Sequence, residues 1–143
     1  MIYQAMCTSF KVGLLNGDFD FGTGTSQTFK AALYTDSASL SAATTAYSTT
    51  NEASGSGYTA GGQALTISVV PTSTGTTAFL SFADVTWNTT TITARGALIY
   101  KADGVTNPAI AVLDFGEIKQ TNAGDFTINF PLANANNAII QIA

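Results

Sequence analysis

The sequence predicts an all-β protein: an antiparallel β-sandwich with Greek-key or jelly-roll connections and a short N-terminal helix. The first observation is a period of two in hydrophobicity, because apolar and polar residues alternate over several short segments. The second is composition, since 23 threonines among 143 residues favour strands over helices. The third is that glycine, proline and asparagine separate these segments, as turn residues do. The length fits a single domain spanning residues 1–143.

The N-terminal segment is the one part of the chain with a helical period. Four apolar residues recur at every fourth position: Ile2, Met6, Phe10 and Leu14. Asn16-Gly17 follows as a stop signal, so we predict a helix and turn over residues 1–17. Cys7 lies beside this apolar stripe, and we interpret it as a small core residue rather than a reactive thiol.

After residue 18 the period changes to two, and at least seven segments are predicted as strands. They are 29–34, 65–70, 78–82, 91–101, 109–115, 125–130 and 138–142. Asp103-Gly104 and Asn107-Pro108 predict a hairpin loop between the fourth and fifth of them. Pro131 ends the sixth, because proline cannot donate to a ladder. We expect the last strand to pair back against its neighbour.

Residues 36–62 form a long segment of serine, threonine, alanine, glycine and asparagine. Tyr47 and Tyr58 are its only large aromatic side chains. An unstructured connection of this length is unusual in a compact domain. Either the segment packs as an ordered loop through its tyrosines, or it becomes ordered against another chain.

Composition excludes several classes of function. The chain has no histidine, one cysteine, 10% charged residues and a net charge of −4. Without histidine, Ser-His and Cys-His catalysis and the commonest zinc ligand are absent. Five scattered cations cannot form the basic stripe that nucleic acid requires, and no apolar run reaches the length of a membrane span. We predict a protein that is not an enzyme, needs no cofactor and binds neither nucleic acid nor membrane.

The acidic residues are dispersed, and no pair of them predicts an active site. Asp18 and Asp20 lie two positions apart near glycines, so they could share a face and bind Ca²⁺. The EF-hand spacing is absent, and an acidic, solvent-facing turn is the simpler interpretation. We therefore assign no metal ligands.

Four residues are candidates for contacts with other molecules: Arg95, Tyr47, Tyr58 and Trp87. Arg95 is the only arginine and lies opposite the apolar face of its strand, so it could pair with a carboxylate of its own sheet or of a neighbouring subunit. Trp87 could stack on a sugar ring, but a core position is the simpler interpretation.

Several segments together suggest a family. They are Cys7-Thr8-Ser9-Phe10-Lys11, Phe29-Lys30-Ala31-Ala32-Leu33-Tyr34, Thr44-Thr45-Ala46-Tyr47 with Asn51-Glu52, Gly57-Tyr58-Thr59-Ala60-Gly61-Gly62, Thr91-Ile92-Thr93-Ala94-Arg95-Gly96-Ala97-Leu98-Ile99-Tyr100 and Ala123-Gly124-Asp125-Phe126-Thr127-Ile128. In this order they resemble small virion structural proteins of tailed bacteriophages, nearly from end to end.

The resemblance implies a protein without catalytic residues, made in the host bacterial cytoplasm and carried on the virion. Capsid decoration, as a cement protein on the major capsid protein lattice, is the first expectation. A head-tail or tail component is the second. Symmetric assembly into dimers or trimers would follow from such a role. The alternative from a different class is a carbohydrate-binding β-sandwich that uses Trp87, Tyr47 or Tyr58.

Overall fold

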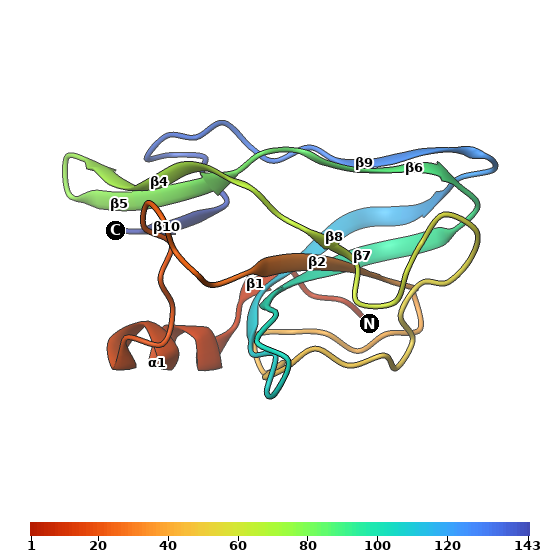
Figure 1. The fold of residues 1–143 in the computed structure, drawn as a ribbon, viewed down its shortest axis with the longest axis horizontal. Helices are drawn as coiled ribbons and strands as arrows, with labels where there is room; N and C mark the ends of the chain where they lie inside the picture. The colour runs from red at the N-terminus through yellow and green to blue at the C-terminus, as the bar shows by residue number, and fades with distance from the viewer.

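The chain forms ten strands and one helix in a computed structural model that describes residues 1–143 (Figure 1). Every ladder between the strands is antiparallel, so the predicted all-β, sandwich-like class is confirmed. The elements are β1 (Ala5–Met6), α1 (Thr8–Asn16), β2 (Phe29–Tyr34), β3 (Gln63–Ala64), β4 (Ile67–Thr74), β5 (Thr77–Phe82), β6 (Val85–Thr90), β7 (Thr93–Lys101), β8 (Ala109–Gln120), β9 (Gly124–Ile128) and β10 (Ile140–Ile142).

The strands lie in two layers. A five-stranded sheet has the order β1-β8-β7-β2-β3, and the second layer contains a three-stranded sheet, β10-β5-β4, and a two-stranded one, β6-β9. In Figure 1 the second layer runs along the top of the molecule, above the five-stranded sheet. The chain enters the upper layer at β4, returns at β7, and crosses again for β9 and β10.

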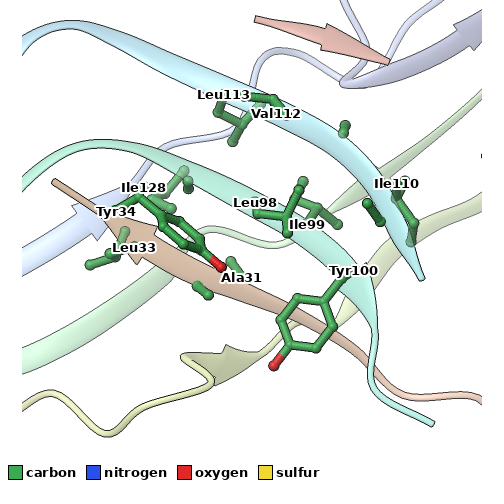
Figure 2. Close-up of a cluster of buried hydrophobic side chains, with 14 of the residues drawn as sticks. Ala31, Leu33, Tyr34, Leu98, Ile99, Tyr100, Ile110, Val112, Leu113 and Ile128 are labelled. Carbon is green, nitrogen blue, oxygen red and sulfur yellow. The ribbon is translucent and has the colours of Figure 1, made fainter. Parts of the chain in front are cut away.

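The core lies against both faces of the five-stranded sheet. A cluster of 30 buried residues includes Leu33, Leu98 and Val112 from its central strands and Ile128 from β9 (Figure 2). All residues of β2 except Lys30 are buried, so side chains of both alternating sets are covered. Burial of one such leucine or isoleucine contributes roughly 2 kcal/mol to folding.

The N-terminal helix is shorter than predicted. It begins at Thr8, because Ala5 and Met6 pair with Val112 and Ala111 of β8 instead of continuing the helix. Sheet pairing satisfies these backbone groups as well as a helix would, and it still places the apolar residues inside. The predicted end is confirmed, since Gly17 adopts a φ of 78° and its N–H donates to the Leu14 carbonyl.

Each of the seven predicted strands appears, with three differences. The segment Val85–Thr90, which the alternation missed, forms β6 and pairs with β9. The fifth predicted strand extends through a bulge to Gln120. The C-terminal strand, β10, pairs with β5 and not with the strand that precedes it in the chain; Ile140 lies opposite Leu80.

The hairpin loop between β7 and β8 is confirmed. The Asp103 carboxylate accepts hydrogen bonds from the backbone N–H groups of Val105, Thr106 and Asn107, at 2.8 to 2.9 Å. These donors stabilise the charged carboxylate and lower the pKa of Asp103 well below its usual value.

Residues 36–62, which we call the covering segment, cover the face of the five-stranded sheet that lies away from β6 and β9. The segment then passes the open edge of the sheet, where Ser56 bridges to Thr91 and Gly57 lies against Thr89 at the end of β6. Figure 1 shows them in orange and yellow below the sheet and at its right-hand edge. Apart from isolated β-bridges, the segment contains no helix or strand. Of the two expectations for it, the structure shows the first: it packs as an ordered loop through its tyrosines.

Candidate functional site

The candidate residues divide into two groups: a tyrosine cluster that holds the covering segment, and an arginine at the edge of that segment. Tyr34 and Tyr100 come from adjacent central strands, β2 and β7, whose pairing places Tyr34 opposite Gly96. Tyr47 and Tyr58 come from the covering segment. In the same pairing Tyr100 lies opposite Lys30, which is four residues before Tyr34 on β2. Side chains alternate between the two faces of a sheet, so Tyr34 and Tyr100 lie on the same face, the one that meets this segment.

Glu52 is the acceptor that joins the two tyrosines of the covering segment. The Tyr47 hydroxyl donates to Oε2 of Glu52 and the Tyr58 hydroxyl donates to its Oε1, each at 2.7 Å. The backbone N–H of Gly61 also donates to Oε1, at 2.7 Å. One carboxylate therefore binds three residues of the segment, one before it and two after it in the chain, and no cation takes part.

The tyrosines also bind the covering segment to the sheet. The Tyr34 hydroxyl donates to the Ser48 carbonyl and the Tyr100 hydroxyl donates to the Gly61 carbonyl, both at 2.6 Å. The rings of Tyr47 and Tyr100 stack with centroids 4.7 Å apart. On the open edge of β2, the Leu33 N–H donates to the Tyr58 hydroxyl at 2.9 Å. The segment thus satisfies an edge that would otherwise expose unpaired backbone groups.

Burial and the nearby carboxylate disfavour ionised phenols throughout this cluster. Burial raises the pKa of Tyr100 to about 12, with a further contribution from the negative charge of Glu52. The pKa values of Tyr34, Tyr47 and Tyr58 are also raised, first by burial. All four hydroxyls therefore stay protonated hydrogen-bond donors at neutral pH.

Arg95 forms its ion pairs within its own chain. Its Nε donates to Oδ1 of Asp114 on β8 at 2.9 Å, and its Nη1 lies 3.5 Å from Oδ1 of Asp36 at the start of the covering segment. The hydrogen bond to Asp114 raises the pKa of Arg95, and in return the pKa of Asp114 is lowered. Of the two pairings left open by the sequence, the structure shows the one with the arginine's own sheet.

Trp87 lies in the core, with 4% of its surface exposed. Its ring packs edge-on against Phe126, with centroids 6.2 Å apart, and lies 6.1 Å from Tyr58. Neither face of the indole is open to a sugar. The sequence grouped Trp87 with Tyr47 and Tyr58, and the structure brings Trp87 beside Tyr58; Arg95 lies apart from them, among Asp36 and Asp114.

The two aspartates considered for calcium form a turn. Oδ1 of Asp20 accepts the Gly22 N–H at 2.8 Å, and the backbone carbonyl of Asp18 accepts a hydrogen bond from Lys101. Nowhere in the structure do three histidine, cysteine or acidic side chains gather as metal ligands would. The Cys7 thiol is buried, and burial raises its pKa to about 11.

Glu52 is the functional residue that sequence reasoning missed. A signal was present: it and Asp36 are the only charged residues of the covering segment, and Glu52 lies between the two tyrosines. A lone acid between hydroxyl donors, with no cation nearby in sequence, indicates a hydrogen-bond acceptor for them.

The fold and these contacts define an all-β protein whose acidic and phenolic side chains bind its own loops. No protein-family model matches the sequence, and neither a curated protein nor a solved structure matches it. No helix of the structure is both long enough and apolar enough to cross a membrane.

Proposed function

We propose that this chain is a non-enzymatic structural protein of a bacteriophage virion, a capsid decoration protein that binds the lattice of the major capsid protein. The resemblance of its sequence segments, in their order along the chain, to small virion structural proteins supports this role. The structural support comes from the outer surface of the covering segment. A protein that binds a lattice needs a surface that is fixed in advance and loses little side-chain entropy on contact.

The covering segment has such a surface, and this observation carries the proposal. Its large side chains, including Tyr47 and Leu40, point inward, and its exposed residues are serine, threonine, alanine, glycine and asparagine, with Asp36 as the one charged exception. Small side chains have few rotamers to lose, and the tyrosine cluster has already ordered the backbone. A repeated lattice then multiplies a modest affinity per copy.

The test begins with virions of the phage that encodes this chain. Mass spectrometry of purified particles is expected to find the chain, and a reconstruction is expected to place it on the outer shell with the covering segment against the capsid protein. Density at the neck or tail would favour the head-tail or tail alternative. Absence of the chain from the virion, or turnover of a glycan panel by the pure protein, would overturn the proposal.

A matched pair of variants then tests the surface itself. Ser39→Arg places a large charged side chain on the exposed face of the covering segment, and Ser68→Arg does the same on β4. Neither serine side chain makes a hydrogen bond in the structure, so both variants should fold. We expect Ser39→Arg to weaken binding to expanded capsids about tenfold or more, and Ser68→Arg to leave it unchanged. Equal binding by both variants would contradict the assignment of the surface.

A further inference from the structure

An apolar groove opens at the end of the molecule that carries the three-stranded sheet. It lies between α1 and the three-stranded sheet β10-β5-β4, both at the left of Figure 1. Its volume is about 360 Å³, and nine of its twelve lining residues are hydrophobic, among them Leu14, Phe79 and Ile142. The single charged residue on its wall is Asp20, which is exposed.

Beside the groove, α1 carries two exposed apolar side chains, Val12 and Leu15, which form a stripe on its surface. Leu15 is 90% exposed and Val12 is 54% exposed. Lys11 lies on the same side of the helix, because residues three and four positions apart are neighbours on a helix surface. Leu14, the residue before Leu15, lines the groove, so the stripe and the groove share one helix.

The charges of the stripe and the groove are complementary and unused. Lys11 and Asp20 are both exposed, and neither forms an ion pair within the chain. The stripe therefore offers apolar side chains and one cation, whereas the groove offers apolar walls and one anion. A two-fold interface brings the same surface of two copies together. The stripe of each copy can therefore meet the groove of the other, and each contact occurs twice.

We propose that a second copy of this chain occupies the groove, in a two-fold dimer in which Leu15 of each copy enters the groove of the other and Lys11 pairs with Asp20. The dimer would cover the most exposed large hydrophobic residue of α1 and close an apolar opening that the chain leaves to solvent. The inference goes beyond the virion role and does not depend on it, since a monomer can also bind a lattice.

The test is the mass of the full chain in solution, by sedimentation velocity over a range of concentrations. The expected species has twice the mass of the 14.7 kDa chain. Leu15→Glu should raise the dimer dissociation constant about a hundredfold, because it places a charge where an apolar side chain is buried. The matched control is Val105→Glu, at a residue 86% exposed in the β7–β8 loop, which should remain dimeric.

The proposed ion pair is tested by a double-mutant cycle. Lys11→Gln and Asp20→Asn should each weaken the dimer about threefold to tenfold, and the double variant should be no weaker than either one. Asparagine keeps the oxygen that accepts the Gly22 N–H, so the turn at Asp20 is preserved. Additive losses would overturn the pairing of Lys11 with Asp20.

A monomer at all concentrations would overturn the proposal, as would a dimer that Leu15→Glu leaves intact. Thermal unfolding of each variant shows whether it is folded, and both replaced residues are exposed enough for folding to persist. The two proposals fail separately: a monomer that still decorates capsids refutes only the dimer, and a dimer absent from virions refutes only the virion role.

Discussion

The covering segment and the end of the molecule around α1 use opposite means to complete the core. The covering segment has almost no regular secondary structure, yet four tyrosines and Glu52 fix it against the five-stranded sheet. The α1 end consists of a helix and three hydrogen-bonded strands, yet it leaves an apolar groove open and Leu15 exposed. Regular hydrogen bonding is therefore neither required for a closed surface nor enough to produce one.

The difference lies in what the large side chains reach. Each tyrosine that holds the covering segment has a hydroxyl that forms a hydrogen bond within the chain, so burial of the ring leaves no polar group unsatisfied. At the α1 end the large residues are phenylalanine, leucine and isoleucine, which have no polar end and so no fixed partner. Such a surface accepts any apolar partner of the right shape, which is why a second copy can complete it.

Alkaline pH is expected to have the largest effect on this contrast, because it acts at once on the four tyrosines that hold the covering segment: Tyr34, Tyr47, Tyr58 and Tyr100. A phenol whose pKa is raised by folding contributes its full stability below its unfolded value of 10, and this contribution is lost as the pH rises toward the folded value, about 12 for Tyr100. We expect hydrogen exchange to show the covering segment opening above pH 10, before β4 and β5.

The same experiment has an internal control in the absorbance of tyrosinate. The phenols of the cluster should ionise together with the opening of the covering segment, and Tyr100→Phe should make unfolding less steeply dependent on pH. Ionisation of all the tyrosines near pH 10 in a chain that stays protected from exchange would show that the cluster does not hold the segment.

A glycine at the end of the covering segment gives the next largest expected effect. Gly62 has a φ of 78°, and a β-carbon there would collide with the carbonyl oxygen of Ala31 on β2. Gly62→Ala should lower the free energy of unfolding by about 4 kcal/mol, through backbone strain and displacement of the segment from the sheet.

The matched control is Gly75, in the turn between β4 and β5. It also has a positive φ, 60°, but a β-carbon there meets no atom within 4 Å. Gly75→Ala should therefore cost only about 1 kcal/mol, from backbone conformation alone. Equal losses in denaturant titrations of the two variants would mean that the close approach of residue 62 to β2 contributes nothing.

Much of the strand layer could be predicted from the sequence because it depends on local patterns. Alternation located β2, β4 and β9, and Asp103-Gly104 located the hairpin loop. Alternation did not locate β6, because Asn88 and Thr89 interrupt the pattern that Val85 and Trp87 begin, and the strand continues through its pairing with β9. The helix start was missed because Ala5 and Met6 pair with β8, a partner more than a hundred residues away.

The candidate site could be predicted only in its parts. Sequence analysis could single out Tyr47 and Tyr58 as the large side chains of a polar segment, and Arg95 as the only arginine. It could not place Tyr34 and Tyr100 on the face that meets them, since this depends on the register of β2 against β7. The role of Glu52 follows only once those rings surround it.

Removal of the Glu52 carboxylate should have the smallest of the three effects and the most specific one. Glu52→Ala leaves the hydroxyls of Tyr47 and Tyr58 and the Gly61 N–H without their acceptor, and water can replace it in part because the site is half-buried. We expect a loss of about 2 kcal/mol in the free energy of unfolding, measured in urea. The opening should be confined to the covering segment in hydrogen exchange, while the groove beside α1 keeps its protection.

Two further variants separate the acceptor from the charge. Glu52→Gln retains one carbonyl oxygen for Tyr58 and Gly61 and replaces the other by an amide, so it should cost less than alanine. Glu117→Ala removes an exposed acid, paired only with Lys119, and should leave both stability and exchange unchanged. If Glu52→Ala were as harmless as Glu117→Ala, the ring packing of the tyrosines, and not their common acceptor, would be what holds the covering segment to the sheet.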